Sequence, residues 1–126
     1  PCLRSSDVRL LLEVMSQETI DGVVLGSACS DTIKEVKSNK HLIKKTLDRN
    51  SLWLAFTPQI FKKKVLINSI LNKDLSNKVF NDEASLVEAN NGQLKIIQGS
   101  KDNLKITFPD DINLAKSILI SQGRME

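Results

Sequence analysis

The chain is poor in several residue types on which ligand and metal sites commonly depend. Its 126 residues include no tyrosine, one tryptophan, one histidine and two cysteines. Cys2 and Cys29 match no metal or redox spacing, and His41 has no second histidine, cysteine or aspartate at ligand spacing. The sequence therefore predicts no metal site, and we expect two reduced thiols in a cytoplasmic protein.

Long apolar runs and glycine-rich phosphate loops are also absent. No run approaches the ~18 apolar residues of a membrane span, and there is no basic-then-apolar leader. The chain lacks GxGxxG and the GxxxxGKS or GxxxxGKT loop, whose backbone amides hold nucleotide phosphates. We expect a soluble chain with no membrane partner and without the phosphate loop of a nucleotide enzyme.

Neither sign of charge dominates, since 18 lysines and arginines stand against 15 acidic residues. Lysines gather within 37–45 and at 62–64, but no aromatic side chains alternate with them as in single-strand nucleic-acid binders. We interpret both groups as solvated lysines and expect no nucleic-acid partner.

The periodicity of apolar residues predicts helices and strands within one domain, the number that this length supports. Helical spacing follows Ser5, and residues 23–29 form a short apolar run typical of a buried strand. Further helices are predicted at 62–71, at 82–89 and from Pro109, and further extended segments at 94–98 and 103–107. This order predicts an α/β layered fold.

Residues 32–36 and 42–46 are two strand-like runs on either side of a polar turn at 37–40. They predict a hairpin whose apolar content is too low for the centre of a sheet, so we expect it to project as an arm. Exposed strand edges commonly pair with another chain. His41 lies at the tip of this arm, where we expect it to be solvated.

The segment DRNSLWLAFTPQIF at 48–61 has no periodic amphipathic pattern and combines an arginine with aromatic and turn residues. A single arginine beside apolar residues suits a phosphate or carboxylate, because its planar group donates two parallel hydrogen bonds. Arg49 is therefore a candidate for anion binding. Three aromatic residues are expected to anchor the core around a turn at Pro58: Trp53, Phe56 and Phe61.

Two further positions leave alternatives open. Asp82 and Glu83 open a predicted helix, where acids cap the helix or, alternatively, form a carboxylate pair for acid–base chemistry. Adjacent helical residues point in different directions, so we expect capping by at least one of them. Lys105 lies between apolar residues of a predicted strand, where its ammonium requires either a structural ion pair or a ligand phosphate.

Four segments together resemble one family, the 2-C-methyl-D-erythritol 4-phosphate cytidylyltransferases of the non-mevalonate isoprenoid pathway. They are DTIK at 31–34, DRNSLWLAFTPQIF at 48–61, NDEASLVEA at 81–89 and GSKDNLKITFPDDINLAKSIL at 99–119. The opening PCL also resembles the end of the family's HDAARPCL segment. The resemblance covers essentially the whole chain, but only the C-terminal half of such an enzyme, and the start without methionine is expected to be that of a fragment.

The resemblance implies a three-layer α/β/α nucleotidyltransferase fold of the nucleotide-diphospho-sugar transferase kind. Residues 1–126 would be the C-terminal part of its single domain, with an arm at about 31–49 that pairs two subunits into a homodimer. The implied reaction transfers a cytidylyl group from CTP to 2-C-methyl-D-erythritol 4-phosphate, giving CDP-methylerythritol and pyrophosphate. CTP and its Mg²⁺, or another divalent cation, would bind mainly to the family's N-terminal half, so we expect residues 1–126 alone to be inactive.

Carried over position by position, the resemblance assigns five residues to the polyol phosphate. Arg49 matches the arginine that binds this phosphate from the neighbouring subunit, and Lys105 matches a lysine near the same phosphate, so both are expected to be catalytic. Thr32 and Thr57 match threonines that line the site. Asn81 stands where the family often has threonine, and its amide can replace the hydroxyl donor but is bulkier.

Two alternatives compete with this interpretation. Ribitol-5-phosphate cytidylyltransferases share the fold, the TPQ segment and a similar LKIT segment, although DRNSLW and DEAS favour the methylerythritol enzyme. A non-catalytic oligomerisation module is the second alternative. Its arm would pair with a partner while the basic residues stay solvated.

Overall fold

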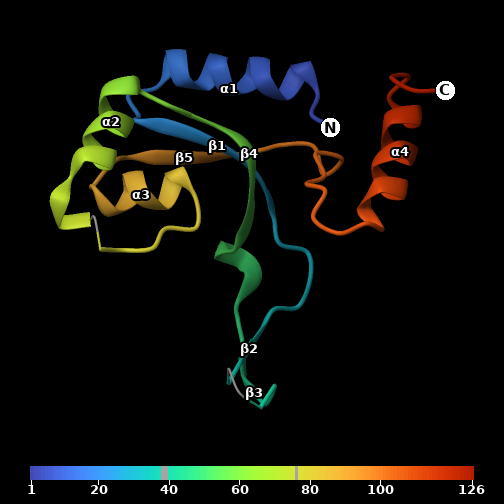
Figure 1. Cartoon of the computed structure of the whole chain (residues 1–126), viewed down its shortest axis with the longest axis horizontal. Helices are drawn as coiled ribbons and strands as arrows, with labels where there is room; N and C mark the ends of the chain where they lie inside the picture. The colour runs from blue at the N-terminus through green and yellow to red at the C-terminus, as the bar shows by residue number, and fades with distance from the viewer. Residues whose placement is uncertain (38–39, 76) are drawn as a thin grey trace.

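The computed structural model describes residues 1–37, 40–75 and 77–126 (Figure 1). Within them the helices and strands follow in the order α1 (Ser5–Gln17), β1 (Gly22–Ala28), β2 (Lys34–Val36), β3 (Ile43–Thr46), β4 (Trp53–Phe61), α2 (Lys63–Leu71), α3 (Glu83–Ala89), β5 (Leu94–Gln98) and α4 (Asp111–Ser121). Short 3-10 turns lie at Arg49–Ser51 and Lys73–Leu75. The α/β prediction is confirmed.

Strand β1 is the centre of a three-stranded sheet with the order β4-β1-β5. It runs antiparallel to β4 and parallel to β5. The first six residues of β1 are buried, as expected for a strand covered on both faces. Gly26 permits this close packing, because a Cβ atom there would lie 2.6 Å from the backbone oxygen of Leu54.

The hydrophobic core lies between α1 and the sheet. Leu11 of α1 is fully buried against Val23 and Leu25 of β1, and Phe56 and Ile60 of β4 pack against this cluster. Helical spacing in α1 places its apolar residues on one face, so the same stripe that predicts the helix also covers the sheet. The predicted helix and the predicted buried strand are both confirmed.

Helix α4 lies apart from the sheet, beside the N-terminal residues (Figure 1). The buried Cys2 Sγ donates to the backbone oxygen of Ala115 at 3.6 Å, and Gln122 Nε2 donates to the backbone oxygen of Cys2 at 3.0 Å. The two ends of the chain therefore meet at α4.

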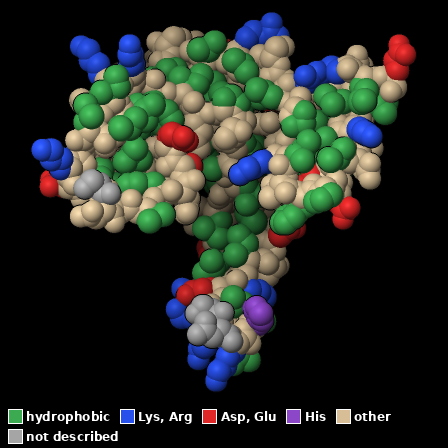
Figure 2. Space-filling model, viewed as in Figure 1, with side chains coloured by type: hydrophobic (Ala, Val, Ile, Leu, Met, Phe, Trp, Pro, Cys, Tyr) green, Lys and Arg blue, Asp and Glu red, His purple; other side chains and the backbone are tan. Residues whose placement is uncertain are grey.

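The arm is confirmed as a separate two-stranded sheet, in which β2 and β3 pair antiparallel. It projects away from the main sheet (Figure 1), and Lys and Arg side chains surround its end (Figure 2). His41 is exposed, as expected. Ser38 and Asn39, which belong to the predicted turn, lie outside the described residues.

The predicted turn at Pro58 is wrong, because β4 continues through this residue. The pairing of β1 with β4 becomes irregular between Val24 and Gly26, where three residues of β4, 56–58, stand against Leu25 alone. Proline has no N–H to donate and is tolerated at such a bulge.

The aromatic anchors are confirmed only in part. Phe56 packs against the core, whereas Phe61 is half-buried and Trp53 is 39% exposed. Trp53 begins β4 next to the arm, beyond the part of the sheet that α1 covers. Its prediction as a core anchor is therefore wrong.

The predicted strand at 103–107 is also wrong, since these residues form a loop. In the described sheet, β4-β1-β5, they pair with no strand, and the loop bonds to β4 through the Asn103 side chain instead of a strand ladder. None of the helices in the described part of the chain has the length and apolar character needed to cross a lipid bilayer.

Candidate functional site

An open cleft of about 1220 Å³ lies beside β4. Its walls are strand residues 54–59, the turn at 81–83 and the loop at 101–106, together with the start of the chain and the end of β1. Polar side chains of these walls are Ser27, Ser30, Thr57, Gln59, Asn81, Asp82, Glu83, Lys101, Asn103 and Lys105. The cleft thus combines hydroxyl, amide and ammonium donors on three different segments.

Strand β4 supplies the floor of the cleft. Thr57 and Gln59, on either side of Pro58, both line the cleft. Thr57 lies within the irregular stretch opposite Leu25, and bulges of this kind often redirect a side chain beside a functional site. Thr57 is exposed to the cleft.

The turn at 81–83 is held against β4 by one amide side chain. Gln59 Nε2 donates to Asp82 Oδ2 at 2.8 Å, and Gln59 Oε1 accepts from the backbone N–H of Ala84 at 3.1 Å. Asn81 and Glu83 flank this contact and are exposed. Gln59 therefore fixes the wall that presents Asn81.

Asp82 is the N-cap of α3, as predicted for at least one of the two acids. It accepts from the Ser85 backbone N–H at 2.9 Å, while Ser85 Oγ accepts from the Asp82 backbone, so the two residues form a capping box. Burial alone raises the pKa of Asp82, but hydrogen bonds from Gln59 and Ser85 outweigh it and hold the pKa below its ordinary value. Asp82 is thus a carboxylate at neutral pH, unsuited to donating a proton.

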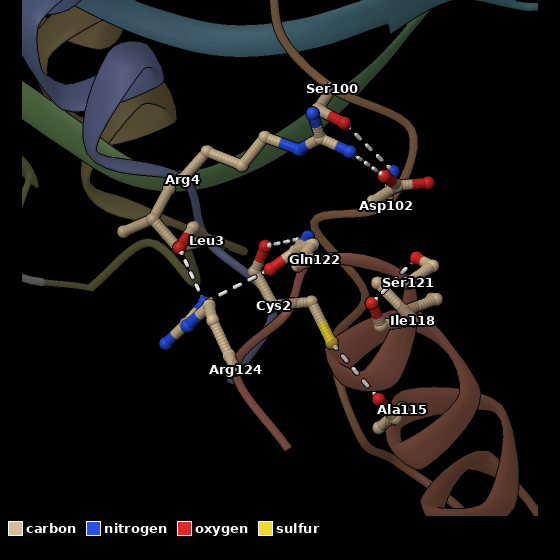
Figure 3. A network of polar contacts seen from close by, with 10 residues as sticks. All are labelled: Cys2, Leu3, Arg4, Ser100, Asp102, Ala115, Ile118, Ser121, Gln122 and Arg124. Atoms are coloured by element: carbon tan, nitrogen blue, oxygen red, sulfur yellow. Dashed lines mark hydrogen bonds and ion pairs between the residues drawn. The ribbon is translucent and has the colours of Figure 1, made fainter. Parts of the chain in front are cut away.

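The loop at 99–106 forms the other wall. Asn103 Nδ2 donates to the backbone oxygen of Thr57, which ties the loop to β4. Asp102 forms an ion pair with Arg4 near the start of α1, and its backbone N–H donates to Ser100 Oγ at 3.2 Å (Figure 3). These contacts come from the sheet, the N-terminal segment and the loop itself.

Lys105 is exposed at the cleft and has no ion pair or hydrogen bond with any residue in the described ranges. Of the two alternatives from the sequence, the structural ion pair is therefore wrong for the described part of the chain. The ion pair was expected because a strand would have placed Lys105 between apolar neighbours. The residue lies in a loop instead, and its side chain is exposed to solvent. An ammonium without a partner is free to bind an anion.

The structure brings together Thr57, Asn81 and Lys105 from the five predicted site residues. Thr32 is exposed near the base of the arm and does not line the cleft. Arg49 is also exposed outside the cleft, and its Nη1 donates to the backbone oxygen of Ser30, a residue at the rim of the cleft.

Arg49 occupies its position because of a local turn. Asp48 is the N-cap of the 3-10 turn, and its Oδ1 accepts from the Asn50 backbone N–H at 3.1 Å. The turn ends the arm and leads directly into β4. Arg49 therefore lies at the junction between the arm and the sheet.

Gln59 and Lys101 line the cleft but were not predicted as site residues. Strand alternation does not identify Gln59, because the pairing of β4 with β1 is irregular around Thr57 and Pro58. Lys101 shows no sequence signal beyond its charge. In the described ranges, no group of three or more His, Cys, Asp or Glu side chains is arranged to hold a metal ion.

Comparisons with known proteins agree on one family. The family model described as 2-C-methyl-D-erythritol 4-phosphate cytidylyltransferase matches residues 1–121. A curated protein of that name from Acinetobacter baylyi is 41% identical over 122 residues, covering 97% of this chain and 50% of that protein. Its counterpart from Wigglesworthia glossinidia brevipalpis is 38% identical over 115 residues, covering 91% of this chain and 49% of that protein.

Solved structures agree with the sequence comparisons. The crystal structure of the Francisella tularensis 2-C-methyl-D-erythritol 4-phosphate cytidylyltransferase matches with a TM-score of 0.82 at 31% identity, covering 94% of this chain and 55% of that one. The chain spans about half the length of the curated relatives it matches, and its fold is the corresponding part of their nucleotidyltransferase fold. The chain belongs to the 2-C-methyl-D-erythritol 4-phosphate cytidylyltransferase family.

Proposed function

We propose that residues 1–126 are the C-terminal part of a single-domain cytidylyltransferase. The complete enzyme would transfer the cytidylyl group of CTP to 2-C-methyl-D-erythritol 4-phosphate. The observation that carries this proposal is the cleft beside β4, in which Thr57, Asn81 and the unpaired Lys105 lie on three walls. Family membership supplies the reaction, and the cleft supplies donors suited to a phosphate.

In this reaction a phosphate oxygen of the polyol attacks the α-phosphorus of CTP. The new P–O bond forms as the bond to the β-phosphate oxygen breaks, and pyrophosphate leaves with its electron pair. Both reactants are anions, so catalysis depends on aligning them and on neutralising their charge. Lys105 would neutralise charge on the polyol phosphate, while the Thr57 hydroxyl and the Asn81 amide would donate hydrogen bonds.

Arg49 would act in the neighbouring subunit of a homodimer. It lies outside the cleft of its own chain, at the base of the arm. The arm carries exposed apolar side chains, with Val36 at 46%, Leu42 at 55% and Ile43 at 63%. Burying them against a second copy would stabilise a dimer and carry Arg49 and Thr32 towards the partner's cleft.

CTP and a divalent cation, usually Mg²⁺, would bind mainly to residues that precede this chain in a longer protein. The described residues gather no group of three or more His, Cys, Asp or Glu side chains that could hold this cation. A cytoplasmic location, expected from two cysteines without a metal or redox spacing, belongs to the same proposal.

The test is turnover by a full-length protein that contains this sequence, with CTP and methylerythritol phosphate as substrates. We expect CDP-methylerythritol and pyrophosphate from the full-length protein and no product from residues 1–126 alone. Ribitol 5-phosphate, offered as a competing acceptor, should not displace methylerythritol phosphate. Product from residues 1–126 alone would contradict the proposal that CTP binds mainly outside these residues. Absence of transfer by the full-length protein would favour the non-catalytic oligomerisation module.

A further inference from the structure

We propose that Asn103 is a positioning residue that holds Lys105 at the cleft through its hydrogen bond to β4. This inference rests on the proposed function, because it takes the polyol phosphate as the ligand of Lys105. Asn103 is not expected to touch the reacting atoms. Its effect on the reaction would pass through the lysine two residues further along the loop.

The loop has few anchors close to Lys105. Neither Lys105 nor Ile106 forms a hydrogen bond with any residue that the structure describes. The nearest anchor to the main sheet is Asn103, whose Nδ2 donates to the backbone oxygen of Thr57, 46 positions away in the sequence. The next contact along the chain is the Thr107 backbone N–H, which donates to Asp111 Oδ2 at 2.8 Å.

Other contacts shape the loop without fixing it to the cleft. The backbone N–H of Asn103 donates to the backbone oxygen of Ser100 at 3.1 Å, and Asp102 pairs with Arg4 (Figure 3). The Arg4 and Asp102 side chains are 48% and 37% exposed, and exposed ion pairs contribute little to stability. Among the described residues, the bond from Asn103 to Thr57 is the hydrogen bond that joins this loop to β4, the floor of the cleft.

Lys105 is sensitive to this placement because its ammonium has no partner of its own in the described ranges. A contact to a transferring group contributes only when its geometry is held, and a displacement of about 1 Å can cost about a hundredfold in rate. Removing the Asn103 amide frees the loop from β4. Lys105 then spends less time within reach of the phosphate.

The experiment is a double-mutant cycle in the full-length protein, with Asn103→Ala, Lys105→Ala and the double variant. Asn103→Ala should lower kcat/KM for methylerythritol phosphate about tenfold or more, and the KM for CTP should change less than about twofold. In the Lys105→Ala background, Asn103→Ala should change kcat/KM less than about twofold. Asn113→Ala, on the exposed face of α4, is the matched control and should behave like the wild type.

Asn103→Asp provides a second variant of the same size whose carboxylate cannot donate to the Thr57 oxygen, in case the alanine variant fails to fold. An equal loss in both backgrounds, or activity of Asn103→Ala within about twofold of the wild type, would overturn the positioning role. The proposed function would still stand in that case, because wild-type turnover reports on it separately. Absence of wild-type turnover would overturn both.

Discussion

Strand β1 buries its first six residues, whereas every residue of β3 in the arm is exposed. The two regions also differ in their charges. In the arm, Lys44 and Lys45 pair with Glu35 and Lys34 donates to Thr46 Oγ1. Lys105 instead faces the cleft unpaired in the described part of the chain. The main sheet gains its stability from contacts within this chain. The apolar side chains of the arm, in contrast, are exposed: Val36, Leu42 and Ile43.

This contrast distinguishes the solvated lysines of the arm from a lysine placed to bind a ligand, which the sequence alone does not distinguish. Figure 2 shows basic side chains at the end of the arm, yet the cleft has only two basic side chains among the described residues, Lys101 and Lys105 of one loop. Charge density alone would have placed the site on the arm. Its place in the cleft, and the absence of a structural partner among the described residues, favour Lys105 instead.

The largest effect is expected in the core. Leu25→Ala should lower the free energy of unfolding by about 3 kcal/mol, because Leu25 is fully buried and its loss leaves a cavity between the sheet and α1. Urea unfolding followed by circular dichroism measures this change. A loss below about 1 kcal/mol would show that burial of β1 in the main sheet contributes little more to stability than the exposed arm does.

The next effect compares the lysine at the cleft, Lys105, with a lysine of the arm, Lys40. In the full-length protein, Lys105→Ala should lower kcat/KM by about a hundredfold, near 3 kcal/mol, because it removes a charge placed to bind the phosphate in the transition state. Lys40→Ala on the arm should change activity less than about twofold, since this lysine is exposed at the arm's end. Equal losses from both substitutions would contradict the site assignment.

A smaller effect is expected on dimerisation. Ile43→Ala should raise the dissociation constant of the full-length dimer by about tenfold, because a side chain that is 63% exposed in one chain would be buried between two. Analytical ultracentrifugation over a dilution series measures this shift. Ile67→Ala is the control, because Ile67 is also an exposed isoleucine, at 42%, but lies on α2 outside the arm. It should leave the dissociation constant unchanged.

The smallest effect is a pH dependence that arises at the cleft. The pKa of Asp82 is held below its ordinary value of 3.8 in the folded chain, so its contribution to stability is complete above that value. The contribution is lost as the pH falls through the lowered folded pKa. Asp82→Asn should therefore weaken the acid dependence of the free energy of unfolding, whereas an unchanged dependence would show that the Gln59 contact does not stabilise the carboxylate.

Local patterns predicted much of this fold. Helix α1 and strand β1 follow directly from apolar spacing, and the capping role of Asp82 follows from acids placed at the start of a helix. The hairpin of the arm was also predicted from short runs on either side of a turn. Each of these features depends on residues close together in the chain.

The remaining features depend on distant contacts. Pro58 was expected to turn the chain, but its position opposite a pairing irregularity with β1 keeps it within β4. Residues 103–107 have a strand-like composition, but they pair with no strand of the described sheet and form a loop. The bond from Gln59 to Asp82 spans 23 positions and could not be inferred from either segment alone. The assignments of Thr32, Arg49, Thr57, Asn81 and Lys105 to the polyol phosphate remain predictions.

The central claim is that the arm of one subunit supplies Arg49 to a cleft in which the other supplies Lys105. Mixing the full-length Arg49→Ala and Lys105→Ala proteins, with subunit exchange verified by mass spectrometry, tests it directly. Each mixed dimer would then contain one complete site, so random exchange should restore about a quarter of the wild-type turnover from two nearly inactive parents. If Arg49 instead acted within its own subunit, neither site of the mixed dimer would be complete, and turnover would stay at the level of the parents.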